Sequence, residues 1–392
     1  MRAPQPSSSG KIVNCSFARC DDYPVYAAAT WLEALRSGNT YAENDKQAIG
    51  AACNQDDDIE DQDAWLPQGV PYDLNASDQG TYLKITTGGR LTLRAGTRVD
   101  GGGIGSAGTF AAAGTVAKPI ALTSPSATPA PGDWLGVEFL PGGGGRLTHA
   151  VVSYAQTGCA IASDRGIRIE HSTLRHCLED GVRLSGSAVA VVKHCSIYRN
   201  GEMGINVTGN ARPGLGSQWQ ADNPGQNSLY NNGQYDLPNN TAGALRAENN
   251  WWDETTAAGV RARIYDAEDN GALGAVDCSP FLSTQSAGLL SAPASSDEAP
   301  LVIMSVAATS TGVGAAIQVS LSRPAALRVT IRNIAGRTVR EISAQAERST
   351  VVTWDRISAL GTAAPAGRYL VEVQALADGG GLVRVLTPLA LR

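Results

Sequence analysis

Apolar and polar residues alternate in short runs through most of the chain. In residues 91–99 the apolar side chains of Leu91, Leu93 and Val99 are separated by polar residues and by a turn at Gly96. A period of two residues is typical of β-strands, because successive side chains point to opposite faces of a sheet. The runs are short and are separated by Gly, Asn and Ser. We therefore predict many short strands joined by tight turns.

Three of these runs repeat one another. Each contains a histidine among alternating residues and reaches a glycine shortly afterwards. The histidines are 22 and 23 residues apart, and the glycines are 23 and 23 residues apart. These positions are His149, His171 and His194, with Gly158, Gly181 and Gly204. A fourth copy surrounds Asn14, and a degenerate copy spans residues 227–233.

A repeat of this length with alternation inside it predicts a parallel β-helix, whose coils each contain three short strands and three turns. Leucine-rich repeats have a similar length, but their Leu-x-x-Leu-x-Leu frame is absent. Coils stack about 4.8 Å apart, so a recurring position forms a column. We expect the histidines and the glycines to form such structural ladders. Val152, Leu174 and Ile197 would form a third column inside the core.

The β-helix pattern extends over residues 1–282. Residues 1–80 are less regular. Within them, residues 26–35 look helical, and the sequence pattern does not fix the fold of residues 26–80.

The composition changes after the β-helix. Residues 283–300 are rich in Ser, Ala and Pro, which is typical of a linker. Residues 301–392 alternate over longer runs separated by turn residues, which predicts a small antiparallel Ig-like β-sandwich. The expected fold class is all-β, a parallel β-helix followed by this sandwich.

Residues 249–282 resemble the closing coil of bacterial right-handed parallel β-helix proteins. The matching residues are Asn249-Asn-Trp251-Trp252, Ile264-Tyr-Asp266 and Val276-Asp-Cys-Ser-Pro280-Phe-Leu282. That family usually has Gly at the position of Asp253 and Tyr at the position of Cys278, so the local turn differs here. The resemblance implies that the β-helix is right-handed.

Residues 326–388 resemble the FlgD-like Ig-like module of the flagellar hook cap and the related C-terminal sorting domains of secreted bacterial proteins. The matching residues are Ile331-Arg-Asn-Ile-Ala-Gly336-Arg-Thr-Val-Arg, Trp354-Asp355 and Pro365-Ala-Gly367-Arg-Tyr369. Such modules imply export, followed by surface attachment or secretion. Neither resemblance fixes a function, because one fold can carry many different sites.

Composition and charge exclude several classes of protein. The 392 residues include 31 Lys and Arg against 37 Asp and Glu, a formal net charge of -6. This balance argues against nucleic-acid binding, which needs a basic face. No apolar run approaches the roughly 18 residues of a membrane span. The first ten residues lack the apolar core of a secretory signal, so export would depend on a signal outside this sequence.

Paired carboxylates are the first candidate for chemistry. Glu179 and Glu202 share one position of the repeat, and Asp180 is next to Glu179. Two carboxylates about 5–10 Å apart could act as acid and base in a glycoside hydrolase, and a polysaccharide lyase is the related alternative. The interpretation that we prefer is that they are turn residues in water. The Asp pair and the Lys or Arg set of pectinolytic enzymes are absent.

Metal binding has two candidates, and we favour a structural role for both. The histidine ladder occupies a turn position that often holds stacked Asn in this fold, as Asn14 does here, and parallel rings do not converge on one ion. The acidic run includes Asp56, Asp57, Asp58 and Asp61 and could bind Ca²⁺, but it lacks the glycine and spacing of a calcium loop. We expect a solvated loop there and no other cofactor.

Aromatic and cysteine residues complete the candidates. Trp219 lies in a polar insertion and is the aromatic residue best placed to stack on a sugar ring. Trp251 and Trp252 are expected to cap the end of the coil stack. Cys15 and Cys195 fit inward positions as small buried side chains. Cys20 could pair with Cys53 or Cys15 in an oxidising compartment.

These observations favour an exported, non-catalytic bacterial protein at the cell surface or outside the cell. Its β-helix would be a rigid rod for adhesion, glycan contact or display, and its last domain would anchor or sort it. Partners would be polysaccharides or other components of the cell surface or extracellular matrix. An enzyme acting on polysaccharides and a structural subunit that self-assembles through coil ends or strand edges are the alternatives.

Overall fold

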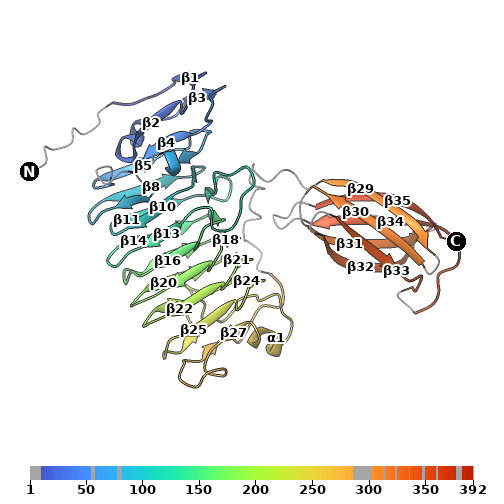
Figure 1. Cartoon of the computed structure of the whole chain (residues 1–392). Helices are drawn as coiled ribbons and strands as arrows, with labels where there is room; N and C mark the ends of the chain where they lie inside the picture. Colours follow the sequence, from blue (N-terminus) through green and yellow to red (C-terminus); the bar gives the residue numbers. More distant parts are fainter. Residues whose placement is uncertain are drawn as a thin grey trace, which may run out of the picture. The chain divides into compact units, whose positions relative to one another are not determined.

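The computed structural model describes residues 10–53, 58–76, 82–285, 302–311, 314–322, 325–334, 336–346, 349–358, 361–376 and 382–391. The chain forms two compact units, Met1–Leu290 and Ser291–Arg392. Figure 1 shows many short stacked strands in the first unit and a few long strands in the second.

The first unit is a parallel β-helix with three sheets, because each full coil adds one parallel strand to each sheet. The eight-stranded sheet contains β7 (Tyr82–Ile85), β10 (Gly103–Ser106), β13 (Gly136–Phe139), β16 (Cys159–Ile161), β19 (Val182–Leu184), β22 (Ile205–Thr208), β25 (Leu237–Asn240) and β27 (Ile264–Tyr265). The seven-stranded sheet contains β5 (Gln62–Trp65), β8 (Arg90–Arg94), β11 (Thr109–Ala113), β14 (Gly144–Thr148), β17 (Ile167–Glu170), β20 (Val189–Lys193) and β23 (Arg212–Gly214). The nine-stranded sheet contains β2 (Val25–Ala28), β4 (Ile49–Ala52), β6 (Tyr72–Asp73), β9 (Arg98–Asp100), β12 (Ile120–Thr123), β15 (Ala150–Ser153), β18 (Thr173–Arg175), β21 (Ser196–Tyr198) and β24 (Ser228–Tyr230).

Short elements complete the two ends of this unit. They are the pair β1 (Ser16–Ala18) and β3 (Thr40–Ala42), the pair β26 (Leu245–Arg246) and β28 (Val276–Asp277), the 3-10 helices η1 (Ala29–Ala34) and η2 (Leu74–Ala76), and the helix α1 (Ala257–Arg261). The helical reading of residues 26–35 is therefore wrong for their first part, which is strand β2. Pairing with β4 there overrides the helix preference of the alanines. The second part is one short 3-10 helix.

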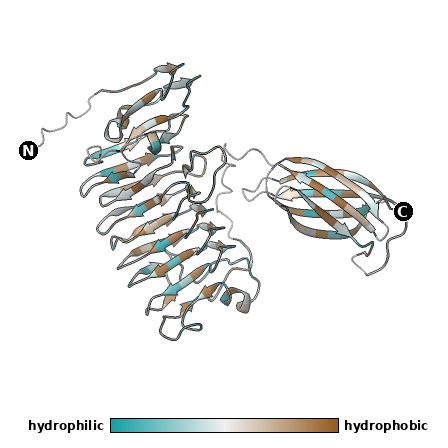
Figure 2. Cartoon of the chain, viewed as in Figure 1, coloured by the Kyte–Doolittle hydropathy of each residue, from teal (hydrophilic) through white to brown (hydrophobic). Residues whose placement is uncertain are grey.

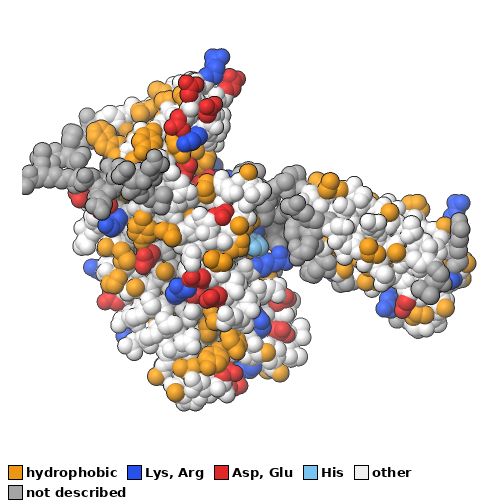
Figure 3. Space-filling view, viewed as in Figure 1, with side chains coloured by type: hydrophobic (Ala, Val, Ile, Leu, Met, Phe, Trp, Pro, Cys, Tyr) orange, Lys and Arg blue, Asp and Glu red, His pale blue; other side chains and the backbone are white. Residues whose placement is uncertain are grey.

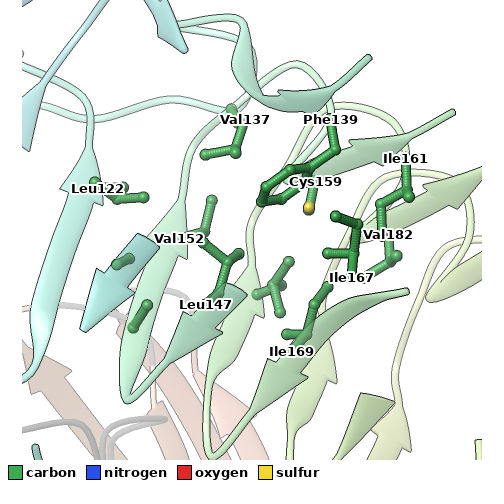
Figure 4. Packing of buried hydrophobic residues seen from close by; sticks show 14 of the residues in the cluster. Leu122, Val137, Phe139, Leu147, Val152, Cys159, Ile161, Ile167, Ile169 and Val182 are labelled. Carbon is green, nitrogen blue, oxygen red and sulfur yellow. The ribbon is translucent and has the colours of Figure 1, made fainter. Parts of the chain in front are cut away.

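The core consists of columns of inward side chains. Val152, Leu174, Ile197 and Leu229 are in register on four successive strands of the nine-stranded sheet, and each is fully buried. Figure 4 shows similar residues from the three sheets packing together inside the coil. Full burial of such a side chain stabilises the fold by roughly 1.5–3 kcal/mol. Repetition of the same slot in every coil thus builds a continuous core.

A column of buried amide side chains closes the turns between the nine-stranded and eight-stranded sheets. Asn200 Oδ1 accepts a hydrogen bond from the backbone N–H of Cys177 at 3.1 Å. In the next coil Asn232 Oδ1 accepts from Asn200 Nδ2 at 2.9 Å, and Asp236 Oδ1 accepts from Asn232 Nδ2 at 2.7 Å. These side chains satisfy backbone N–H groups that lie outside the sheet ladders.

A second amide column follows the histidine positions. Asn227 Oδ1 accepts from the backbone N–H of Cys195 at 3.0 Å, and Asn250 Oδ1 accepts from Asn227 Nδ2 at 3.0 Å. Stacked asparagines therefore occupy the inward slot after the left-handed turn residue. Asn14 and Asn249 have the same left-handed backbone as the three histidines, so asparagine also occurs in the histidine slot, as expected for Asn14.

Two glycines of the ladder, Gly181 and Gly204, pack directly against the first amide column. Gly158, Gly181 and Gly204 precede equivalent strands of the eight-stranded sheet. A Cβ on Gly181 would lie 2.7 Å from Asn200 Nδ2 and 2.9 Å from the Gly204 carbonyl oxygen. The turn packs so closely on the buried amides that only glycine fits.

The second unit is an antiparallel β-sandwich with its own core. One sheet has the order β29 (Ile303–Thr311), β30 (Gly314–Leu321) and β33 (Ser349–Trp354). The other has the order β32 (Thr338–Ala346), β31 (Ala325–Asn333), β34 (Gly367–Leu376) and β35 (Leu382–Leu391). Alternating residues of both sheets face inward, and Trp354 packs edge-on against Tyr369 at a centroid distance of 5.5 Å. Figure 2 shows the same alternation of hydrophobic and hydrophilic residues along the strands of both units.

Candidate functional site

The candidate carboxylates lie in the turns that lead into the eight-stranded sheet. Glu179 and Asp180 lie between β18 and β19, and Glu202 lies between β21 and β22. The backbone N–H of Glu202 donates to the Glu179 carbonyl, and that of Glu179 donates to the Gln156 carbonyl. Gln156, Glu179 and Glu202 therefore occupy one position on three successive coils.

Glu179 is held by three hydrogen-bond donors. Its Oε1 accepts from Gln156 Nε2 at 2.6 Å, and its Oε2 accepts from Thr157 Oγ1 at 3.0 Å and from Arg183 Nη2 at 2.5 Å. The hydrogen bond from Gln156, together with those from Arg183 and Thr157, holds the pKa of Glu179 below its ordinary value. Glu179 is thus a carboxylate at neutral pH, which does not suit a general acid.

Asp180 is fully buried and holds the same arginine. Its Oδ2 accepts from Arg183 Nε at 2.7 Å and from Asn206 Nδ2 at 3.0 Å. Two carboxylates therefore fix the guanidinium of Arg183, which is part-exposed on β19. The group becomes a preorganised hydrogen-bond donor at the surface, and because one guanidinium is shared by two carboxylates, the cluster keeps a net negative charge.

Outward side chains of the eight-stranded sheet continue this surface along the coils. Arg183 is in register with Asn206 on β22, and Tyr265 on β27 ends the sheet. The ring of Tyr265 lies 5.4 Å from that of Tyr235. We call Arg183, Asn206, Tyr235 and Tyr265 the eight-strand face. Figure 3 shows acidic and basic side chains close together on the β-helix, with hydrophobic side chains above and below them.

A tyrosine covers the first strands of the same sheet. A Cβ added to Gly103 or Gly105 would collide with the ring of Tyr82, so the ring lies directly across these two glycines. Its hydroxyl donates to Glu138 Oε2 at 2.6 Å, and burial raises the pKa of Tyr82 above its ordinary value. Tyr82 and Glu138 thus add a fixed polar and aromatic contact near the other end of the sheet.

The histidine ladder lies on another edge, between the seven-stranded and nine-stranded sheets. The rings of His149 and His171 stack at a centroid distance of 4.9 Å, and those of His171 and His194 at 4.7 Å. Each histidine has a positive φ, between 48° and 54°, and Asn14 has 55°. Burial lowers the pKa of all three imidazoles. Parallel rings present no common point to an ion, and no cluster of metal-binding side chains occurs in the described ranges.

Trp219 belongs to a segment on the same edge as that ladder, and the candidate carboxylates lie on a different edge. It belongs to the segment between β23 and β24, and 76% of its side-chain surface is exposed. The segment is tied back by a 2.7 Å hydrogen bond from Lys193 Nζ to the Asp222 carbonyl. The structure therefore does not bring Trp219 and Glu179 into one site.

The acidic run contributes little to a metal site. Asp56 and Asp57 lie outside the described residues. Asp58 Oδ2 lies 3.8 Å from Lys84 Nζ, and the carbonyl of Asp61 accepts from the backbone N–H of Arg90. Where they are described, these residues form local contacts typical of a surface loop.

A further aromatic column was not predicted from the sequence. Rings on five successive coils contact one another at centroid distances of 4.8–6.2 Å, and they are Tyr154, His176, Tyr198, Tyr230 and Trp251. The rings do not share one position of the repeat. Tyr198 and Tyr230 lie one residue before the position of Tyr154 and His176, and Trp251 is in register with Ser228, so a search for one constant spacing misses the column. Trp252 is buried in the closing coil.

All seven cysteines are free thiols, and five of them are buried. No disulfide joins the seven cysteines, all of which lie in the described residues. Cys195 is fully buried, whereas the expectation of a buried Cys15 is wrong. Cys15 occupies the same slot, with its N–H bonded to Asn39 Oδ1 at 3.0 Å, but it is exposed because it belongs to the first coil described.

Comparison with known families agrees with this architecture. Residues 135–262 match the family described as right handed beta helix region, and residues 305–379 match the FlgD Ig-like domain. Both resemblances drawn from the sequence are thereby confirmed. Domains of these two kinds are typical of extracellular or surface proteins. A comparison with curated proteins found no match to the chain. In the described part, no helix is long and apolar enough to cross a membrane.

Proposed function

We propose that this protein acts outside the cell as a binding protein for an extended, uncharged polysaccharide, which lies along the eight-strand face. The observation that carries the proposal is the fixed guanidinium of Arg183 in register with Asn206, on the same sheet as Tyr265, whose ring contacts Tyr235 in the turn before β25. Fixed hydrogen-bond donors and tyrosine rings supply orientation and contact area at low entropic cost.

The shape of the ligand follows from the spacing of the strands. Strands about 4.8 Å apart place the eight strands of this sheet over roughly 34 Å. Weak contacts that recur on neighbouring coils favour a repetitive polymer, because each further contact is made by a ligand that is already bound.

An anionic ligand is disfavoured, because three carboxylates share two guanidinium groups here and leave a net negative charge. Glu179 and Asp180 are paired with Arg183, and buried Asp236 is paired with Arg263 at 2.8 Å. The location outside the cell rests on the two domain types, which are typical of surface proteins. In this proposal the Ig-like unit serves as the anchoring or sorting module.

The test is a panel of neutral and acidic polysaccharides, read for binding by the full chain and for new reducing or unsaturated ends. We expect binding to a neutral glycan without new ends. Tyr265→Ala should weaken binding at least tenfold. Tyr26→Ala is the matched control, because Tyr26 is an exposed tyrosine on the nine-stranded sheet, and it should leave binding unchanged.

Three outcomes would overturn the proposal. Product formation would support the polysaccharide lyase or hydrolase alternative. Loss of binding in Trp219→Ala but not in Tyr265→Ala would place the binding site beside the histidine ladder, between the seven-stranded and nine-stranded sheets. If the chain binds no glycan of the panel and forms filaments under the electron microscope, the structural-subunit alternative is supported.

A further inference from the structure

The Ig-like unit has one open side. Strands β29 and β35 are edge strands of the two sheets and pack against each other, which closes one side of the sandwich. The other two edge strands, β32 and β33, contact each other less extensively than β29 and β35 do. Over the described residues they pair only with β31 and β30 respectively, so their outer backbone groups have no strand partner there, and such edges can pair with an added strand.

A cavity of about 490 Å³ opens on this side. Its walls include the apolar side chains of Ala315, Ile342 and Trp354, with Arg340 and Asp355 as its charged groups. Ala315 and Trp354 are buried, so the floor of the cavity is part of the sandwich core. The volume falls in the range of sites that take a small ligand or one large side chain.

Arg340 supplies the positive charge in the wall of the cavity. Its Nε is buried and has no hydrogen-bond partner. Arginine stays charged at all physiological pH values, and among the described residues no carboxylate lies within ion-pair distance of Arg340. A buried, unsatisfied donor of this kind costs free energy that an incoming anion would recover. A carboxylate is the anion whose two oxygens match a guanidinium.

We propose that the cavity binds an acidic peptide segment in an extended conformation, added at the open side between β32 and β33. The peptide backbone pairs with the free edge of β33, and an Asp or Glu side chain enters the cavity and pairs with Arg340. Asp355 can accept an N–H of the peptide through the oxygen that is not bonded to Ile357 N. Strand addition supplies affinity, and the buried ion pair supplies specificity.

The experiment uses the full chain and two blocked hexapeptides, Thr-Val-Thr-Glu-Val-Thr and its Gln counterpart, titrated by calorimetry. We expect the Glu peptide to bind at least tenfold more tightly than the Gln peptide. Arg340→Gln should remove that preference. Arg384→Gln is the matched control, because Arg384 is an exposed arginine on β35, and it should keep the preference. Thr353→Trp fills the cavity while leaving Arg340 in place, and it should abolish binding.

Several outcomes would overturn the proposal. Equal binding of the two peptides, or an unchanged preference for the Glu peptide in Arg340→Gln, would show that Arg340 does not bind the carboxylate of the peptide. Full competition by sodium acetate at equal concentration would reduce the site to one for small carboxylates. Dimerisation that depends on Arg340 would make a second copy of the chain the occupant.

Discussion

Residues with a left-handed backbone recur at the corners of the β-helix, and many of them are not glycine. Tyr154, His176 and Arg199 have φ between 54° and 63°, as the histidine ladder does. This conformation costs about 1–2 kcal/mol per residue for an L-amino acid. Stacking between rings on neighbouring coils contributes about 0.5–1.5 kcal/mol per aromatic pair. Ring columns therefore offset part of the strain that each corner imposes.

His176 makes this column sensitive to pH. It stacks on Tyr154 and meets Tyr198 edge-on, and burial, with Arg175 and Arg199 nearby, lowers its pKa to about 3. From pH 6.5 down to about 3 the unfolded chain binds a proton that the folded chain does not. Stability is therefore complete above pH 6.5 and decreases as the pH falls, by up to about 2 kcal/mol at pH 5.

His176→Tyr should remove that contribution, because tyrosine already occupies the equivalent position at Tyr154. Urea unfolding of the β-helix at pH 7.5 and at pH 5 measures the loss. We expect a smaller loss in the variant than in the parent chain. The three ladder histidines stay in both proteins and contribute equally to each. An identical loss in the two proteins would show that His176 is not buried as a neutral ring.

At the scale of the elements, the stability of the closing coil depends on one buried ion pair. Asp236 precedes β25 and is fully buried, and it is held by Arg263 from the segment before β27 at 2.8 Å and 3.1 Å. The same carboxylate ends the amide column by accepting from Asn232. The pair thus joins the last two coils to the buried column.

Arg263→Met should destabilise the β-helix by about 3–5 kcal/mol, because it leaves Asp236 buried without a counter-charge. Adding Asp236→Asn should restore part of the loss. Arg168→Met breaks a half-exposed pair with Glu170 and should cost less than about 1 kcal/mol. Equilibrium denaturation compares the three variants. Equal losses in Arg263→Met and Arg168→Met would contradict a special role for the closing coil.

The elements also show what a sequence can predict here. One coil takes 22–23 residues here, so a position that recurs at this spacing falls into a column. The spacing of His149, His171 and His194 therefore predicts the ladder that their rings form. The contacts of Arg183 were not predictable in the same way, because they depend on side chains of two coils meeting at one turn. Trp219 was a plausible binding residue from its neighbours in sequence, but its segment belongs to a different edge from the eight-strand face.

At the scale of the whole chain, the two units have separate hydrophobic cores that share no residue. All seven cysteines belong to the β-helix unit, and the Ig-like unit contains none. Thiol labelling in denaturant therefore reports the unfolding of the β-helix alone. Cys15 is exposed and should react before unfolding, whereas fully buried Cys159 and Cys195 should react only with it.

Trp354→Ala separates the two units experimentally. Trp354 is buried in the core of the sandwich, and its Nε1 donates to the Ile357 carbonyl at 3.0 Å. Its removal should cost the Ig-like unit about 3–5 kcal/mol. Calorimetry should then show one transition moved to lower temperature, while the denaturant midpoint for labelling of Cys159 and Cys195 stays in place. A matching shift of the labelling midpoint would mean that the two cores unfold together, and each unit would then depend on the other for its stability.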